Sequence, residues 1–373
     1  MRIVLFCHSL LSDWNHGNAH FLRGIASELV ARGHDVSAYE ARDAWSVRNL
    51  VAEHGTAPLH RFRDVYPDLH VERHDPRTLD VDAALDGADV VLVHEWNEPA
   101  LVQRIGQARA AGGSFSLFFH DTHHRAVTAP EEMAACDLTH YDGVLAFGDV
   151  IRDLYLARGW AQRAWTWHEA ADTRVFRPLP EPPDGPDGDV VWIGNWGDDE
   201  RSRELLEFLI EPIHDLQLRG AVYGVRYPDH ALALLREHGL EYRSWLANFD
   251  VPRVFSRFRA TVHVPRRPYA RSLPGIPTIR PFEAMACGIP LISAPWADTE
   301  GLFRAGEDYL LARDGGEMKR LLRDLLNDTE MAASLAVSGR RTVLDRHTCA
   351  HRVDELLHIV AGLRPVAPSV MST

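Results

Sequence analysis

The 373-residue chain has few cysteines, no long apolar run and no excess of basic charge. Its four scattered cysteines exclude a disulfide framework or a zinc knuckle and fit a reducing, cytoplasmic location. No apolar run reaches the roughly 20 residues that span a bilayer, and the N-terminus is typical of a first strand, not of a signal peptide. The net charge of −13 argues against nucleic acid and anionic membranes as partners. We therefore expect soluble partners, no transmembrane segment and no membrane-binding patch; nothing in the sequence indicates an oligomeric state.

The length suggests two domains of roughly 180 residues each. Strand-like runs alternate with helix-like segments along both halves, which is typical of α/β folds with parallel sheets. A Pro-, Gly- and Asp-rich linker (178–188) separates an N-terminal domain (1–177) from a second domain (189–346). A helix-like segment (347–363) and a tail expected to be disordered (364–373) follow. The expected strands are 2–7, 35–40, 89–94, 114–120, 143–147, 163–170, 189–194, 221–225, 242–245, 260–264 and 290–293, and the expected helices of the second domain include 201–215, 229–238 and 317–327.

The most informative stretch is 279–295, with the sequence IRPFEAMACGIPLISAP. Pro281 suits the first turn of a helix and Gly288 suits its end, and the apolar run 289–292 predicts a buried parallel strand. The pattern leaves Glu283 in the first turn of a short helix, whose N-terminus attracts anions. A carboxylate there can accept hydrogen bonds from ribose hydroxyls while free backbone N–H groups face a diphosphate. The stretch therefore suggests a nucleotide-sugar site.

Residues 280–284 and 286–288 (RPFEA and ACG) resemble the donor-site motif of GT-B glycosyltransferases. The nearest branch is the CgeB-like, or spore-maturation, group, which is related to the large retaining glycosyltransferase family 4. The resemblance implies two Rossmann-like domains that face each other across a cleft, with 347–363 crossing back to the first domain. It also implies a metal-independent enzyme without a cofactor, a UDP-, GDP- or dTDP-linked sugar donor, and a small-molecule or glycan acceptor.

The loop before this helix departs from the family pattern. Many related enzymes carry a second Glu eight residues before the ribose-binding one, and here that position is Gly275. By resemblance, backbone N–H groups from Gly275 and Ile276 to Thr278 and Ile279 hold the sugar and phosphates. For Arg280, a donor contact and a salt bridge at the helix start both stay open.

A loop after the first strand holds another candidate pair, Gly17 and Asn18. A Gly there lets the backbone approach a ligand closely, and the start of the next helix offers free N–H donors. By resemblance, this loop touches the donor phosphates or the acceptor. The alternative is an ordinary turn with Asn18 as the helix cap.

His120 and Asp121 stand where an apolar strand runs into the polar residues of 118–124, FFHDTHH. A His at that strand end is expected to point into the interdomain cleft, and by resemblance His120 binds a hydroxyl of the donor sugar, with Asp121 beside it. Two alternatives are a metal site with His123 and His124, and a purely structural histidine cluster.

Arg201 and Arg203 follow the turn that contains Gly194 and Asn195. A planar guanidinium binds phosphate in two-pronged fashion and can neutralise a leaving diphosphate without a metal. The alternative is a surface salt-bridge network with the three acids at 198–200, which suits Arg203 better than Arg201.

Trp245 and Phe249 precede a predicted helix in the second domain. By resemblance, this segment wraps the nucleobase, and either ring could stack on it; core packing is the alternative. The acceptor cannot be named from the sequence, because loops such as 56–75 are expected to vary freely.

The sequence as a whole predicts a retaining glycosyltransferase that acts on a nucleotide-diphosphate sugar. Only Asp121, His16 and His20 are candidates for an inverting base, and none is strong. Two other functions stay open: a nucleotide-sugar epimerase on the same fold, and a catalytically silent nucleotide-sugar binding protein.

Overall fold

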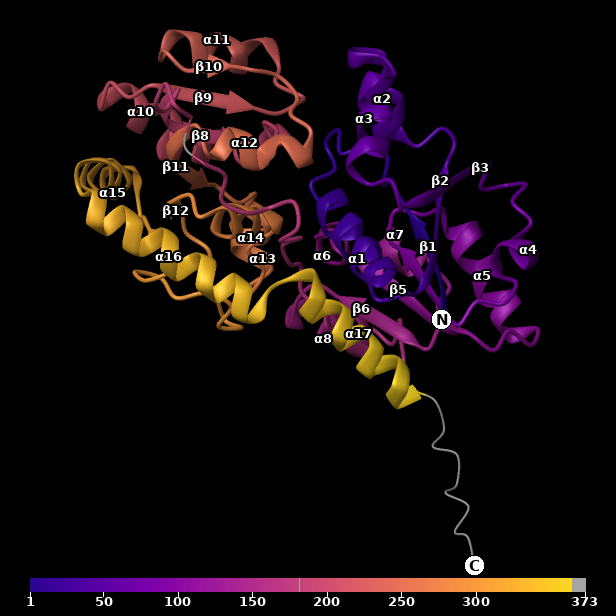
Figure 1. Cartoon of the computed structure of the whole chain (residues 1–373). Coiled ribbons are helices and arrows are strands. Elements are labelled where there is room, and N and C mark those ends of the chain that lie inside the picture. Colours follow the sequence, from indigo (N-terminus) through magenta and orange to yellow (C-terminus); the bar gives the residue numbers. More distant parts are fainter. Residues whose placement is uncertain (181, 364–373) are drawn as a thin grey trace, which may run out of the picture.

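The computed structural model describes residues 1–180 and 182–363 and has two α/β domains side by side (Figure 1). One parallel sheet has the strand order β3-β2-β1-β4-β5-β6-β7, and the other has the order β10-β9-β8-β11-β12-β13. This confirms the predicted α/β class; the predicted tail over 364–373 lies outside the described residues. The strands are β1 Arg2–Cys7, β2 Asp35–Ala41, β3 His70–His74, β4 Val90–His94, β5 Ser116–Asp121, β6 Gly143–Ala146, β7 Ala164–Thr166, β8 Gly188–Ile193, β9 Gly220–Tyr223, β10 Glu241–Tyr242, β11 Phe258–His263, β12 Leu291–Ser293 and β13 Leu310–Leu311.

Helices connect the strands, as parallel pairing requires. The first helix is buried over residues 19–26 and again at Leu29, and it is followed by Gly33 in a left-handed conformation, with φ of 80°. The helices are α1 Ala19–Ala31, α2 Trp45–His54, α3 Ala57–Val65, α4 Val81–Leu85, α5 Pro99–Ala110, α6 Arg125–Thr128, α7 Pro130–Ala134, α8 Asp149–Ala157, α9 Ser202–Leu205, α10 Glu211–Asp215, α11 Asp229–Glu237, α12 Val251–Phe255, α13 Arg267–Ser272, α14 Ile279–Cys287, α15 Gly315–Asn327, α16 Thr329–Arg346 and α17 Cys349–Leu363.

The expectation that 56–75 is a loop is wrong. This segment contains α3 and β3, and β3 pairs in parallel with β2, with Ser37 opposite His70 and Ala41 opposite His74. The edge strand has the sequence HVERH, and only its last residue is buried. Because its composition is polar, the strand lacks the apolar periodicity that would have predicted it.

The last two helices run across both domains. α16 packs on α14 of the C-terminal domain, and α17 packs on α1 of the N-terminal domain (Figure 1). The indole N–H of Trp167 donates to the carbonyl of Arg352 at 2.8 Å, and Arg32 pairs with Asp354 at 2.5 Å. α17 therefore braces the N-terminal domain.

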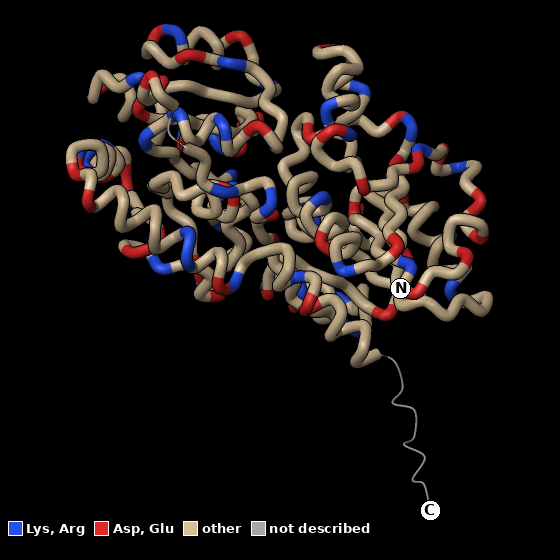
Figure 2. The backbone as a smooth tube through the Cα atoms, viewed as in Figure 1, with Lys and Arg blue, Asp and Glu red and all other residues tan. Residues whose placement is uncertain are grey.

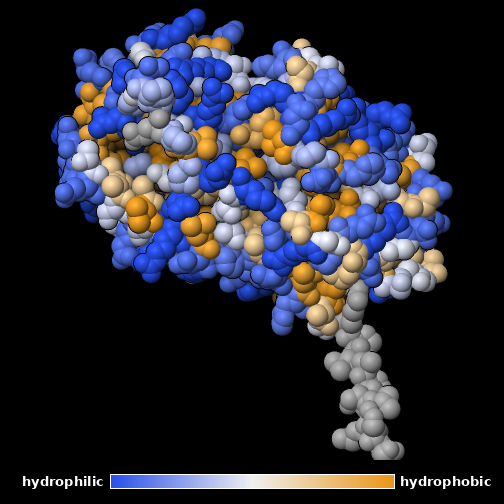
Figure 3. All heavy atoms as spheres, viewed as in Figure 1, coloured by the Kyte–Doolittle hydropathy of each residue, from blue (hydrophilic) through white to orange (hydrophobic). Residues whose placement is uncertain are grey.

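The surface is polar and carries charges of both signs. Lys and Arg alternate with Asp and Glu over both domains (Figure 2), and on the face shown in Figure 3 hydrophilic side chains cover most of the surface. All four cysteines are free and buried. Among the described residues, we find no helix with the length and apolar character needed to traverse a bilayer.

Candidate functional site

A cleft of about 700 Å³ lies between the two domains. Loops that follow the carboxyl ends of parallel strands in both sheets line it, which is where open α/β sheets bind ligands. We call the lining residues between positions 8 and 169 the N-terminal wall and those between 192 and 280 the C-terminal wall. The cleft therefore combines side chains from two separate sheets.

Arg201 is the central cation of the C-terminal wall. Its side chain is buried, and it donates to the carbonyl and Oδ1 of Asn195, both at 2.6 Å, and to the carbonyl of Val264 at 3.1 Å. No carboxylate pairs with it among the described residues, so the predicted alternative of a salt bridge to the preceding acids is wrong for Arg201. Burial, together with nearby Arg266, lowers the pKa of Arg201 to about 9, and the guanidinium remains protonated at neutral pH.

Two more arginines of the C-terminal wall flank Arg201. Arg266 donates to Oδ1 of Asn195 and to Glu200, both at 3.0 Å, and Arg280 pairs with Glu283. Arg203 is exposed and does not line the cleft. The sequence therefore suggests Arg203 at a place where the structure has Arg266, which follows β11.

Gly194 and Asn195 do line the cleft, directly after β8. The carbonyl of Gly194 accepts from the hydroxyl of Tyr227 at 2.9 Å, which fixes the turn. Asn195 also donates across the cleft to the side chain of Asn15 in the N-terminal wall. This asparagine therefore links the arginines of one domain to the other domain.

Glu283 lies elsewhere than the sequence predicts. α14 begins at Ile279, so Glu283 is in its second turn, and its side chain is fully buried behind the cleft. One carboxylate oxygen lies 2.8 Å from Nδ1 of His20, and the other accepts from Arg280. The other helix predictions are confirmed: Pro281 lies in the first turn, and Gly288 ends the helix with φ of 71°. In this structure Glu283 braces α14 against α1 and is not exposed to a ligand.

The start of the donor loop also lies outside the cleft. Thr278, Ile279 and Arg280 line it, but Gly275 and Ile276 do not. The N–H of Gly275 donates to Ala297 at 2.6 Å and that of Ile276 to Leu273 at 3.2 Å, so neither is free for a phosphate. The predicted backbone site over 275–279 therefore shrinks to the residues around Thr278.

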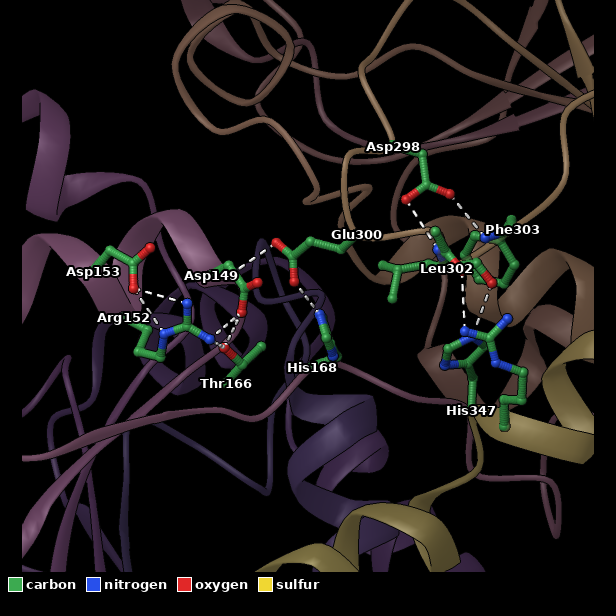
Figure 4. Close-up of polar contacts among 12 residues, drawn as sticks. Asp149, Arg152, Asp153, Thr166, His168, Asp298, Glu300, Leu302, Phe303 and His347 are labelled. Atoms are coloured by element: carbon green, nitrogen blue, oxygen red, sulfur yellow. Dashed lines mark hydrogen bonds and ion pairs between the residues drawn. The ribbon is translucent and has the colours of Figure 1, made fainter.

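Glu300 explains why position 275 is a glycine. Gly275 has φ of 94°, and a Cβ there would lie 2.7 Å from Cγ of Glu300. The Glu300 carboxylate accepts from the N–H of Asp149 at 2.9 Å and lies 2.5 Å from Nε2 of His168 (Figure 4). A side chain at position 275 would displace this contact between the domains.

In the predicted nucleobase segment, Trp245 lines the cleft and Phe249 does not. The indole N–H of Trp245 donates to Oδ1 of Asp13 at 3.0 Å, and the N–H of Asn248 donates to Oδ2 at 3.0 Å. Phe249 packs against the core beneath Arg61, with 5.0 Å between the guanidinium carbon and the ring centroid. For Phe249 the core-packing alternative therefore holds.

On the N-terminal wall, Gly17 and Asn18 line the cleft as expected. Asn18 stands at the cap position of α1, yet its side chain makes no capping hydrogen bond, and both amide atoms are buried without a partner. His16 is also buried there, and its Nε2 has no partner. Burial and the nearby His8 lower the pKa of His16 well below its usual value. These groups offer unsatisfied, uncharged hydrogen-bonding atoms to a ligand.

His120 and Asp121 do not line the cleft, contrary to the prediction. The His120 ring is 1% exposed and packs on Trp167 with 4.9 Å between ring centroids; burial lowers its pKa to about 3. Asp121 is fully buried and accepts from the hydroxyl of Tyr155 at 2.8 Å. The next residues, His123 and His124, line the cleft instead.

The structure also bears on His20 as a candidate base and on the alternative metal site at His120, His123 and His124. His20 is fully buried against Glu283, so of the three candidate bases only His16 reaches the cleft. His120 lies apart from His123 and His124, and within 1–180 and 182–363 no three or more metal-ligating side chains gather in one place.

Glu169 is a site residue that the sequence reasoning missed. It lines the cleft in the loop after β7, is 6% exposed, and makes no hydrogen bond or ion pair with another described residue. Burial and the nearby Glu283 raise the pKa of Glu169 to about 8. The strand expected over 163–170 ends at Thr166 in the structure. Glu169 was therefore assigned to the strand, although it lies in the loop that follows the strand's C-terminal end.

Comparison with known proteins gives a family match and several structural neighbours. Residues 201–358 match a family model described as glycosyl transferase-like, whereas no curated protein matches the sequence. Sucrose-phosphate synthase from Thermosynechococcus elongatus is 14% identical, with a TM-score of 0.67 over 97% of this chain and 99% of that one. Anabaena HepE, solved with UDP and glucose, is also 14% identical, with a TM-score of 0.67 over 97% and 100% of the two chains.

An alpha-glucosyltransferase solved with UDP and a 13-mer DNA is 10% identical, with a TM-score of 0.67 over 97% of this chain and 99% of that one. At these identities the likeness shows a shared fold, and the predicted GT-B architecture is confirmed. The fold, together with the glycosyl transferase-like match over most of the C-terminal domain and α17, supports a glycosyltransferase.

Proposed function

We propose that this chain transfers a sugar from a nucleotide-diphosphate sugar to a small-molecule or glycan acceptor in the interdomain cleft. The observation that carries the proposal is Arg201, a buried guanidinium that faces the cleft without a carboxylate partner among the described residues. Arg266 and Arg280 add positive charge beside it. A buried cation is costly unless an anion compensates it, and a diphosphate would do so.

The same arginines supply the chemistry that the transfer needs. When the glycosidic bond to the diphosphate breaks, negative charge develops on the leaving phosphate, and preorganised guanidinium groups stabilise it. This supports transfer without a metal. The structural neighbours HepE and the alpha-glucosyltransferase were solved with UDP-glucose and with UDP, so a uridine donor is the first to test.

The proposal includes retention of the anomeric configuration. An inverting transfer by direct displacement needs a base that activates the acceptor. Asp13 is occupied by Arg23, Trp245 and Asn248, and Glu200 pairs with Arg266, but His16 and Glu169 also line the cleft. Retention is therefore proposed from the family resemblance to the CgeB-like branch, and NMR of the product's anomeric proton would decide it.

Trp245 belongs to the proposed donor site, beside Leu246 and Asn248 of the C-terminal wall. The acceptor would enter along the N-terminal wall, where Trp45 and Trp96 are 39% and 41% exposed. A net charge of −13 favours an acceptor other than nucleic acid, and the free cysteines fit a cytoplasmic location.

Binding and turnover of nucleotide sugars test the proposal directly. Thermal shift and donor hydrolysis are measured with UDP-, GDP-, dTDP- and ADP-sugars, with and without chelator. Stabilisation by one nucleotide class, with slow chelator-insensitive hydrolysis, is the expected result. Interconversion of two sugar donors would indicate an epimerase, and binding without turnover would indicate a silent binding protein. No response to any nucleotide sugar would refute the proposal.

A further inference from the structure

Glu169 is the most unusual carboxyl group of the cleft. It is 6% exposed, faces the cavity, and has no hydrogen-bond or ion-pair partner in the described part of the chain. The other cleft carboxylates are occupied: Asp13 binds Arg23, and Glu200 binds Arg266. A buried polar group without a partner is costly, so its presence here points to a ligand.

The surroundings of Glu169 place that ligand. Arg280 and Glu283 of α14 and Tyr269 of α13 are the charged or titratable groups that interact with it electrostatically. The Arg280 guanidinium forms its ion pair with Glu283 and none with Glu169, although its charge lowers the pKa of Glu169 slightly against the effect of burial. Glu169 thus belongs to the N-terminal wall but lies near the start of α14, whereas the unpaired cation, Arg201, stands after β8 and η1 (Asp198–Glu200).

The protonation state of Glu169 limits what it can bind. Burial and Glu283 raise its pKa to about 8, so at neutral pH the group is a neutral acid with one O–H donor. A neutral carboxyl group suits an alcohol, which both donates and accepts hydrogen bonds, better than it suits a phosphate. The depth of Glu169, compared with the 41% exposed Trp96, favours the enclosed part of the donor over the acceptor.

We propose that Glu169 hydrogen-bonds a hydroxyl of the transferred sugar and helps to set which sugar the cleft accepts. The proposal rests on the proposed glycosyltransferase function. It makes Glu169 a specificity-determining residue contributed by the N-terminal domain to a donor held by the C-terminal domain. Closure of the cleft on a correct sugar would then involve both domains.

The test compares Glu169→Gln, Glu169→Ala and the control Glu204→Gln. Gln keeps a donor and an acceptor in the same shape but cannot act as a base, whereas Ala removes both. Glu204 is a half-buried carboxylate that pairs with Arg267 outside the cleft. Affinities for UDP and UDP-glucose are measured for each variant, or for the corresponding pair of whichever nucleotide the wild type binds.

Glu169→Ala is expected to weaken UDP-glucose binding roughly tenfold, because it removes one hydrogen bond to the sugar. UDP binding is expected to stay unchanged. Glu169→Gln and Glu204→Gln should match the wild type. Above pH 8 ionisation of Glu169 removes its O–H and adds negative charge near the donor, so the KM for the donor should rise in the wild type and stay flat in Glu169→Gln.

Three results would overturn the assignment while leaving the proposed function intact. The first is an equal loss of UDP and UDP-glucose affinity in Glu169→Ala, and the second is a lowered melting temperature with unchanged affinities. The third is a large fall in kcat of Glu169→Gln at unchanged KM, which would make Glu169 a base. If the wild type binds no nucleotide at all, the proposed function itself fails and this assignment fails with it.

Discussion

The two walls of the cleft carry basic residue types in similar number but differ in charge. The C-terminal wall presents Arg201, Arg266 and Arg280, whereas the N-terminal wall presents histidines, including His8 and His16. Burial affects both walls, but with different results. It lowers the pKa of Arg201 to about 9, which leaves the side chain protonated, and that of His8 to about 4, which leaves the side chain neutral.

Under the proposed function, this difference suits the two walls to different ligands. A wall of protonated arginines complements a diphosphate, because its charges survive burial. A wall of neutral imidazoles, joined by the neutral acid Glu169, complements hydroxyl groups, since both kinds of group can donate or accept hydrogen bonds without net charge. The comparison therefore predicts charge-dependent binding on one side of the cleft and charge-independent binding on the other.

The largest effect should follow removal of the central charge of the C-terminal wall. Arg201→Ala is expected to lower donor turnover at least about a hundredfold, since it removes a preorganised group that stabilises the leaving diphosphate. The matched control is Arg203→Ala, two residues away and exposed, which should stay within about twofold of the wild type. Steady-state donor hydrolysis measures both. Equal losses in the two variants would remove Arg201 from the site.

The next prediction concerns Glu283, which stands behind the C-terminal wall. Glu283→Ala leaves the buried His20 and Arg280 without their partner and should destabilise the fold by about 3 kcal/mol. The affinity of the folded protein for UDP should change less than threefold. Urea unfolding and calorimetry separate the two quantities. Intact stability with lost UDP binding would instead restore the ribose-binding role that the sequence suggests.

Gly275 tests the contact that sets how the two walls face each other. Gly275→Ala forces a side chain into a conformation with φ of 94° and against Glu300, so we expect a loss of about 2 kcal/mol and a higher KM for the donor. Gly301→Ala is the control, because Gly301 has φ of 64° but no heavy atom within 4 Å of an added Cβ. It should lose only about 1 kcal/mol. Equal losses would mean that backbone strain alone, and not the Glu300 contact, requires glycine at position 275.

Both walls also show which features can be predicted from sequence. The strand over 90–94 is apolar up to its last residue, His94, and the helix end at Gly288 follows a local rule, so both could be predicted from neighbouring residues alone. The direction of a side chain at a strand end could not. Successive residues of a strand face opposite sides, so the face of a side chain near a strand end depends on where the strand ends. The strand expected to end at His120 continues to Asp121, and the strand expected to reach residue 170 ends four residues earlier, at Thr166, which leaves Glu169 in a loop.

Contacts between residues far apart in the sequence could not be predicted either. Glu283 and His20 are 263 positions apart, and Gly275 and Glu300 lie in separate loops, so no local pattern could show that these residues meet. Of the arginines of the C-terminal wall, Arg201 could be predicted because it follows β8, whose last four residues are apolar. Arg266 follows β11, which has the mixed sequence FRATVH, and Arg280 lies in α14, so neither follows a strand of that kind.

The smallest predicted effect concerns the neutral state of the N-terminal wall. His16 is 7% exposed, and burial lowers its pKa well below 6.5. Below pH 6.5 the unfolded chain binds a proton at this histidine that the folded protein does not bind, so stability falls as the pH falls. One such group contributes up to about 1.4 kcal/mol for one pH unit below 6.5. The free energy of unfolding, measured in urea at pH 7.5 and pH 5.5, should therefore drop less in His16→Asn than in the wild type, by about 1 kcal/mol. Arg266→Lys, a change in the opposite wall that keeps the charge, should leave the pH dependence as it is. An unchanged slope in His16→Asn would mean that His16 is protonated in the folded protein, and the N-terminal wall would then carry charge like its counterpart.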